Sequence, residues 1–383
     1  MRVLVCSVYR EPSGHGRACR DWIRSLHEAG ADVACRPVQF TGNQKTTDPL
    51  LQRLEKVTFP GGADVVFQHV PPYAMQRVPG LNIGSFFAET RPLPVGWAIR
   101  AQQMDALIVT DPTLANTVRA CAHVQSPVYT IPLPCDLTYW NQDCPVPPLV
   151  ADFARDRFVF YCVGEFARRK GFSTLVRAFI SEFSAWEPVG LLLKTGIAGL
   201  KTAEASAKVR ESLDAVVRGA KLAVVPPIQI VTDRLTDAEI VGIHRSCHCY
   251  VQPSFGENWS YGAMDALLYG KTPIVSRAGG FLSYLDSSCA WLVPTHPEPV
   301  HGEGDVHAEL FSGRQTWDAP DVAQLQKAMR EAYTNASRRK QLAEVGVKRA
   351  LSMSYASVGR QLLRAFDEQA RTGICRLEGG PGP

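Results

Sequence analysis

The chain has 383 residues, a formal net charge of +4, 45% hydrophobic residues and 20% charged residues. This length suits two domains of ordinary size, and the composition is that of a water-soluble globular protein. The charge is small and evenly spread, which gives no strong nucleic-acid signal, and no apolar run approaches the roughly 20 residues that a membrane span requires. Peripheral contact with a membrane surface stays open.

The first half of the chain alternates short apolar strands with helices, a pattern typical of a parallel, doubly wound α/β sheet. Strands are expected at residues 2–8, 32–35, 63–68, 81–87, 105–109 and 127–131, and helices at 17–29 and 114–121.

Two features of this half lie where such strands end. Gly14 and Gly16 precede the first helix, where glycine lets an anionic ligand approach the helix N–H groups. They form only part of the dinucleotide fingerprint, which disfavours a dehydrogenase. His69 follows the strand at 63–68, at the edge where α/β sheets bind ligands. Ordinary turn glycines and a hydrogen-bonded loop histidine are the alternatives.

The segment 132–148 is rich in proline and lacks periodicity, so it is the predicted linker. We expect an N-terminal Rossmann-like domain over residues 1–148 and a C-terminal Rossmann-like domain over 149–350. A last helix over 351–372 and a disordered tail over 373–383 follow.

The second half repeats the strand–helix alternation. Strands are expected at residues 158–163, 189–194, 228–231, 249–252 and 272–276, and helices at 173–183, 203–218, 236–245, 263–269 and within 320–370. Residues 295–317, rich in His, Gly and Glu, are expected to form a long surface loop. The irregular spacing of its His296, His301 and His307 favours solvated side chains over a metal site.

Charged residues gather at two strand-to-helix junctions of this half. Arg168, Arg169 and Lys170 precede a helix, where cations and helix N–H groups could hold a pyrophosphate. Glu257 lies in the loop before another helix, and Asp265 lies eight residues later inside it. Solvated side chains are the alternative for both groups.

Eleven cysteines lie singly in the sequence, several of them inside apolar strands, where a free thiol behaves as a small hydrophobe. The closest cluster, between His244 and Cys249, has one Cys-x-Cys pair and no second pair at zinc-site spacing. We therefore expect no metal. The odd cysteine count and the absence of a signal peptide predict a reducing compartment, the cytoplasm.

Together, VGEFARRKGFSTLVRAF (163–179), PSFGENWSYGAMDALLYGKTPIVS (253–276) and Gly279-Gly280 resemble the nucleotide-sugar domain of the retaining glycosyltransferases of family four. Those enzymes have the GT-B architecture, two tandem Rossmann-like domains with an interdomain cleft. The first half is similar to their acceptor-side domain in Pro12-Ser-Gly14, DVVFQHVPP (64–72) and VYTIPLPCDLTYW (128–140). The resemblance covers nearly the whole chain.

The resemblance implies roles for the residues of the second half. Lys170 would neutralise the donor pyrophosphate, with Arg168 and Arg169 beside it. Glu257 would contact hydroxyls of the donor sugar. The backbone N–H groups near the sugar and phosphate would be those of Asn258, Trp259 and Ser260.

Asp265 would bind the ribose, Gly14 would let the N-terminal loop close on the donor, and His69 would lie beside the reacting sugar. Two positions depart from the family pattern. Asp265 replaces a second glutamate, and Glu165 stands where an arginine is usual.

The implied function is metal-independent, retaining transfer of a sugar from a nucleotide-diphosphate sugar, without a cofactor, to an acceptor hydroxyl. A glycan or lipid-linked saccharide is the expected acceptor. A non-catalytic nucleotide-sugar binding protein, a GT-B phosphorylase and a sugar-nucleotide epimerase are the alternatives.

Overall fold

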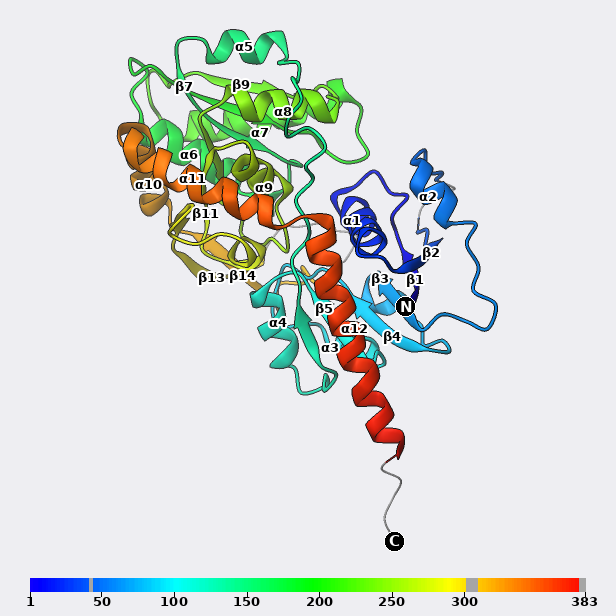
Figure 1. Cartoon of the computed structure of the whole chain (residues 1–383). Helices are drawn as coiled ribbons and strands as arrows, with labels where there is room; N and C mark the ends of the chain where they lie inside the picture. The colour runs from blue at the N-terminus through cyan, green and yellow to red at the C-terminus, as the bar shows by residue number, and fades with distance from the viewer. Residues whose placement is uncertain (41–43, 301–308, 379–383) are drawn as a thin grey trace. The chain divides into compact units, whose positions relative to one another are not determined.

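The computed structural model describes residues 1–40, 44–300 and 309–378. The chain divides into two compact units (Figure 1). Unit 1 comprises Met1–Pro134 and the C-terminal segment from Met353, and unit 2 comprises most of the chain from Cys135 to Ser352. A short stretch at Leu310 also belongs to unit 1. No helix in the described ranges is both long and apolar enough to cross a bilayer.

Unit 1 is built on six parallel strands in the order β2-β1-β3-β4-β5-β6. The strands are β1 (Arg2–Ser7), β2 (Asp32–Pro37), β3 (Val65–His69), β4 (Leu81–Ser85), β5 (Ala106–Val109) and β6 (Val128–Thr130). The helices are α1 (Gly14–Glu28), α2 (Pro49–Leu54), α3 (Val95–Ala101), α4 (Pro112–Arg119) and α12 (Tyr355–Glu378).

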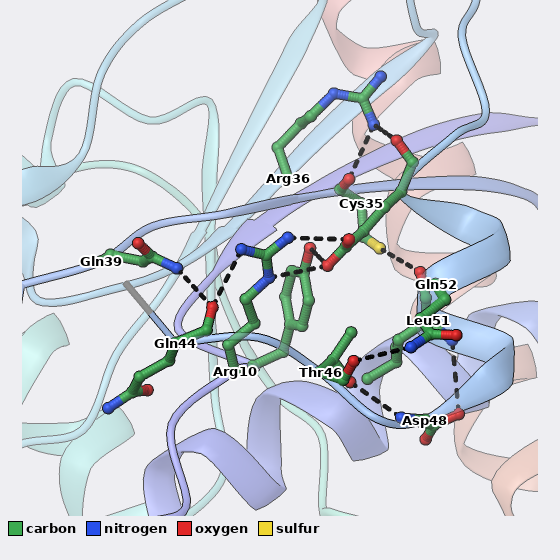
Figure 2. Close-up of polar contacts among 11 residues, drawn as sticks. Arg10, Cys35, Arg36, Gln39, Gln44, Thr46, Asp48, Leu51 and Gln52 are labelled. Atoms are coloured by element: carbon green, nitrogen blue, oxygen red, sulfur yellow. Dashed lines mark hydrogen bonds and ion pairs between the residues drawn. The ribbon is translucent and has the colours of Figure 1, made fainter. Parts of the chain in front are cut away.

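Hydrogen bonds link α2 and the segment before it to the residues that follow β1 (Figure 2). The Arg10 guanidinium donates to both carboxylate oxygens of Glu55 at 2.9 and 2.8 Å, and the Tyr9 hydroxyl donates to the same group at 2.8 Å. Arg10 also donates to the carbonyl oxygen of Gln44 at 3.1 Å. The hydrogen bonds from Arg10 hold the pKa of Glu55 below its ordinary value. The loop that leads from β1 to α1 therefore starts from a fixed position.

Unit 2 is built on a second parallel sheet, in the order β12-β11-β10-β7-β8-β9. Its strands are β7 (Phe158–Val163), β8 (Val189–Lys194), β9 (Ile228–Val231), β10 (Cys249–Gln252), β11 (Thr272–Ser276) and β12 (Trp291–Val293). Its helices are α5 (Pro148–Ala154), α6 (Phe172–Glu182), α7 (Thr202–Gly219), α8 (Asp237–Ser246), α9 (Tyr261–Leu268), α10 (Val322–Thr334) and α11 (Ala336–Ser352).

Helices cover both faces of this sheet. Successive side chains of a strand point to opposite sides, so each strand contributes to the packing on both faces. Phe160 and Cys162 of β7 join the core formed with α6, α7 and α10. Tyr161 lies on the other face, where its hydroxyl is 2.9 Å from Nδ1 of His244 on α8. Burial on both faces leaves the strand ends as the place where polar side chains can meet a ligand.

The two parallel sheets confirm the predicted doubly wound α/β class, and the predicted strands of both sheets are present. The prediction of a surface loop over 295–317 was wrong at both ends, because β13 (Thr295–Pro299) and β14 (Thr316–Pro320) pair as an antiparallel hairpin. His301 and His307 lie outside the described residues. Helix α12 continues to Glu378, so it extends past the expected end at 372, and residues 379–383 lie outside the description.

The last helix packs against α1 within unit 1 at very close range. A Cβ added at Gly359 would lie 1.9 Å from the carbonyl oxygen of Ser25. Near the start of α12, the Tyr355 hydroxyl donates to Oδ1 of Asp21 at 3.0 Å. Only glycine lets the two helix backbones approach this closely.

Gly359→Ala should therefore lower the free energy of unfolding of unit 1 by about 1–3 kcal/mol, the usual cost of overpacking. Gly219→Ala is the matched control, because a Cβ at this last residue of α7 would meet nothing within 4 Å. The control should leave stability unchanged or raise it by up to about 1 kcal/mol. Equal unfolding midpoints for the two variants in urea would contradict the close approach.

Candidate functional site

The turn after β7 is locked to the segment after β10. The 3₁₀ turn Arg168–Lys170 ends at Gly171, whose φ of +73° is left-handed. A Cβ on Gly171 would lie 2.1 Å from the carbonyl oxygen of Pro253. The backbone N–H of Phe255 donates to the carbonyl of Arg169 at 2.7 Å. These contacts fix the basic turn against the loop that carries Glu257.

As a result, the largely buried carboxylate of Glu257 lies next to two cations, Lys170 and Arg169. Lys170 Nζ donates to Glu257 Oε2, and Arg169 Nη1 lies 3.9 Å from Glu257 Oε1. Arg169 also donates to the carbonyl oxygen of Gly256 at 3.2 Å. The Glu257 side chain is 5% exposed, whereas those of Lys170 and Arg169 are 15% and 19% exposed. The local charge of these three groups is +1, which suits an anionic ligand.

Gln252, at the end of β10, holds the carboxylate of Glu257 in place. Its Nε2 donates to Glu257 Oε2 and to Ser254 Oγ, both at 2.9 Å. Its Oε1 accepts from the hydroxyls of Tyr250 and Ser260, both at 2.6 Å. Every hydrogen-bonding position of the amide is used, so its orientation and that of the carboxylate are fixed together.

The loop after β11 supports the backbone of Glu257 and Asn258 from the other side. Gly280 N–H donates to the carbonyl of Glu257 at 2.6 Å, and a Cβ there would lie 2.0 Å from the carbonyl oxygen of Asn258. The Trp259 ring lies 4.5 Å from that of Tyr284. Its Nε1 is buried and finds no hydrogen-bond partner among the described residues.

Ser260 is the N-cap of α9, as expected, and its Oγ accepts from the N–H of Ala263 at 3.2 Å. Asp265 is half-buried inside this helix. Together with burial, its charge raises the pKa of Tyr269. Asp265 therefore lies close enough to Tyr269 for its charge to act on that hydroxyl.

The remaining charged residues of the basic turn point elsewhere. Arg168 lies 3.9 Å from Oε1 of Glu298 and 5.6 Å from the ring of Trp317, so its guanidinium faces the β13–β14 hairpin. Glu165 is exposed. Of the three predicted cations, Lys170 and Arg169 meet Glu257.

In unit 1, His69 ends β3 and is fully buried. Its Nδ1 lies 2.7 Å from Ser85 Oγ, while its Nε2 is buried without a partner among the described residues. The rings of His15 and Phe87 lie 4.8 and 4.9 Å from it. Burial, with the nearby charge of His15, holds the pKa of His69 well below 6.5, so the imidazole is neutral.

Gly14 is exposed at the first position of α1, and a Cβ there would meet nothing within 4 Å. The helix begins three residues earlier than the sequence predicted, because Ser13 caps it by accepting from Gly16 N–H at 3.1 Å. A Cβ on Gly16 would lie 2.1 Å from the carbonyl oxygen of Glu11. Gly16 is therefore required by the fold, while Gly14 leaves open space at the helix N-terminus.

The sequence analysis missed two polar residues at this sheet edge, Gln252 and Lys194. Lys194 ends β8 beside Val163 of β7, where burial lowers its pKa and Asp233 opposes the shift. Both are polar residues at the carboxyl end of an apolar strand. The same position at a strand end led to the prediction of His69, and it applies equally to Gln252 and Lys194.

Solved structures share this fold. Sucrose-phosphate synthase from Thermosynechococcus elongatus has a TM-score of 0.68 at 16% identity, covering 96% of this chain and 98% of that one. HepE from Anabaena, solved with UDP and glucose, has a TM-score of 0.66 at 12% identity, covering 96% and 100%. A glycosyltransferase from Rickettsia africae has a TM-score of 0.66 at 11% identity, covering 96% and 98%.

The predicted GT-B fold is thereby confirmed. At identities this low the likeness establishes the fold and leaves activity to be argued from the site. Comparisons of the sequence with models of known families and with curated proteins found no match.

Gln252→Leu should lower the free energy of unfolding of unit 2 by about 3 kcal/mol, because it leaves several buried polar groups without their partner. Gln229→Leu, at a glutamine of β9 that donates to the Ile230 carbonyl at 3.0 Å, is the control and should lose under about 1 kcal/mol.

Gln252→Glu places a second carboxylate against Glu257. Its stability deficit relative to wild type should be larger at pH 8 than at pH 5, since protonation relieves the repulsion. Denaturant titrations at both pH values decide this, and a deficit independent of pH would contradict the contact.

Proposed function

We propose that this protein is a metal-independent, retaining glycosyltransferase resembling those of family four. It would transfer a sugar from a nucleotide-diphosphate sugar to an acceptor hydroxyl on a glycan or lipid-linked saccharide. The observation that carries the proposal is the contact of Lys170 with the buried Glu257 at the carboxyl edge of a GT-B sheet. UDP-sugars are the first donors to test, because the Anabaena HepE structures contain UDP and UDP-glucose.

The pair offers a donor two complementary groups. Without a ligand, Lys170 and Glu257 neutralise each other, and Arg169 adds a further positive charge. A pyrophosphate is a stronger partner for Lys170 than a single carboxylate, because it carries more charge. When Lys170 turns toward the pyrophosphate, Glu257 keeps its hydrogen bond from Gln252 and can accept hydrogen bonds from sugar hydroxyls.

In the proposed reaction, the bond between the anomeric carbon and the phosphate oxygen breaks as the bond to the acceptor oxygen forms on the same face. The acceptor proton passes to the leaving phosphate oxygen. Lys170 and Arg169 stabilise the negative charge that grows on that phosphate, and a dry setting strengthens their effect. His69 would hydrogen-bond the reacting sugar through Nε2, and Asp265 would bind the ribose.

One observation favours a second candidate, a nucleotide-sugar binding protein without transferase activity. The Nε2 of His69 is covered in this structure, with the His15 ring 4.8 Å away centroid to centroid. A catalytic role for His69 requires His15 to move. Donor binding without release of sugar across a panel of acceptors would support the binding protein.

Lys170→Ala should lower kcat/KM for the donor by about 10²–10³-fold, the usual effect of removing one group that stabilises developing charge. Because this change leaves Glu257 buried without its lysine, the urea unfolding midpoint of Lys170→Ala is measured alongside, to check that the loss is not unfolding. Arg168→Ala is the matched control and should keep kcat/KM within a few fold, since Arg168 faces the hairpin. Near-normal turnover by Lys170→Ala, in a steady-state donor-consumption assay, would remove the proposed role.

Glu257→Gln keeps the shape of the side chain and removes the charge that accepts hydrogen bonds from sugar hydroxyls. We expect kcat to fall by about tenfold or more while nucleoside diphosphate still inhibits competitively. Full activity would place the donor-sugar contact elsewhere.

A further inference from the structure

Three side chains with metal-binding atoms converge in unit 1, away from Lys170 and Glu257 in the sequence. His15 and Cys19 lie one helical turn apart on α1, and His69 ends β3. One ligand atom from each lies within 4.8 Å of the other two. In the part of the chain that the structure describes, no other group of three such side chains converges in this way.

The His69 ring is already oriented as a ligand. Its Nδ1 contacts Ser85 Oγ at 2.7 Å, the kind of outer hydrogen bond that fixes the tautomer of metal-binding histidines. The opposite ring atom, Nε2, is buried and has no hydrogen-bond partner among the described residues. In the tautomer that donates from Nδ1 to Ser85 Oγ, Nε2 carries a buried lone pair without a donor, which is costly, and a metal ion would satisfy it.

The surroundings are dry and sulfur-containing. Cys19 is fully buried. Its Sγ lies 3.8 Å from the carbonyl oxygen of His69 and also interacts with Ser7 and with the backbone of Val8. The rings of Phe87 and Trp22 lie 4.9 and 6.4 Å from that of His69. Two imidazoles and one thiolate in an apolar setting suit a borderline-soft transition-metal ion, and they do not suit Mg²⁺ or Ca²⁺, which prefer oxygen ligands.

We propose that His15, Cys19 and His69 form a three-ligand site for a transition-metal ion such as Zn²⁺, with the fourth coordination position open. Zinc bonds of about 2.0–2.3 Å place tetrahedral ligand atoms about 3.3–3.8 Å apart, so the cluster must contract by roughly 1 Å. His15 is the ligand that moves, because it is half-buried in the first turn of α1. Cys19 binds as the thiolate and releases its proton to solvent.

The consequence for catalysis rests on the proposed function. A metal ion on Nε2 of His69 occupies the atom that would contact the reacting sugar, so the site is inhibitory. Removal of the ion by a chelator restores the free imidazole. The metal would regulate the enzyme and would take no part in transfer.

The test uses the full chain without an affinity tag, kept reduced, with Zn²⁺ affinity measured by competition with a chromophoric chelator. We expect one tightly bound ion per chain, at least tenfold weaker binding in His15→Ala and in Cys19→Ser, and no binding of Mg²⁺. Cys35→Ser is the matched control, because Cys35 is also buried in unit 1 and also lies 3.8 Å from a carbonyl oxygen, that of Leu51. It should bind zinc as the wild type does.

Unchanged zinc affinity in His15→Ala would overturn the site, as would an equal loss in the Cys35→Ser control. His15→Ala keeps the test decisive if Cys19→Ser unfolds, since His15 is only half-buried. Co²⁺ substitution adds a direct readout, a thiolate charge-transfer absorption that Cys19→Ser abolishes. Zn²⁺ should inhibit donor turnover in the wild type and not in His15→Ala. If no preparation turns over any donor, the proposed function fails, while zinc stoichiometry still decides the site.

Discussion

The contact between Lys170 and Glu257 is the interaction on which the proposed ligand-binding edge of unit 2 depends. The two residues are 87 positions apart in the sequence, and the carboxylate is nearly buried. Such a pair is favourable only when its geometry is fixed and its remaining lone pairs are satisfied. Gly171 seats the basic turn against the loop after β10, and Gln252 supplies a further hydrogen bond to Glu257. The glycines and the glutamine are therefore parts of one arrangement.

Much of this edge could be predicted from the sequence, because parallel strands present their carboxyl ends on one side of a sheet. That rule placed Lys170 and Glu257 at the same edge without any knowledge of their contact. It did not show that Arg168 turns to the hairpin, since neighbouring residues of a 3₁₀ turn point in different directions. The hairpin itself was missed because THPEP (295–299) has the composition of a loop, and its strand pairing is with residues 316–320.

Unit 1 shows a different limit. His69 was found from its place at the end of a strand, yet its closest ring neighbours come from other segments. His15 and Cys19 belong to α1, some 50 positions earlier, and spacing along the chain gives no sign that they reach His69. In the two proposals, the same imidazole nitrogen contacts the sugar and binds the metal ion. The two uses exclude each other, which makes the position of His15 the deciding variable in this unit.

The central claim is that donor binding breaks the contact between Lys170 and Glu257. The lysine then binds the pyrophosphate, and the glutamate accepts hydrogen bonds from the sugar hydroxyls. Calorimetric titration of UDP and UDP-glucose into wild type and Glu257→Gln tests it most directly. The account predicts that the variant binds UDP at least as tightly as wild type, because Lys170 is already released, and that it loses the extra affinity contributed by glucose. Weaker UDP binding in the variant, with the glucose contribution intact, would contradict the account.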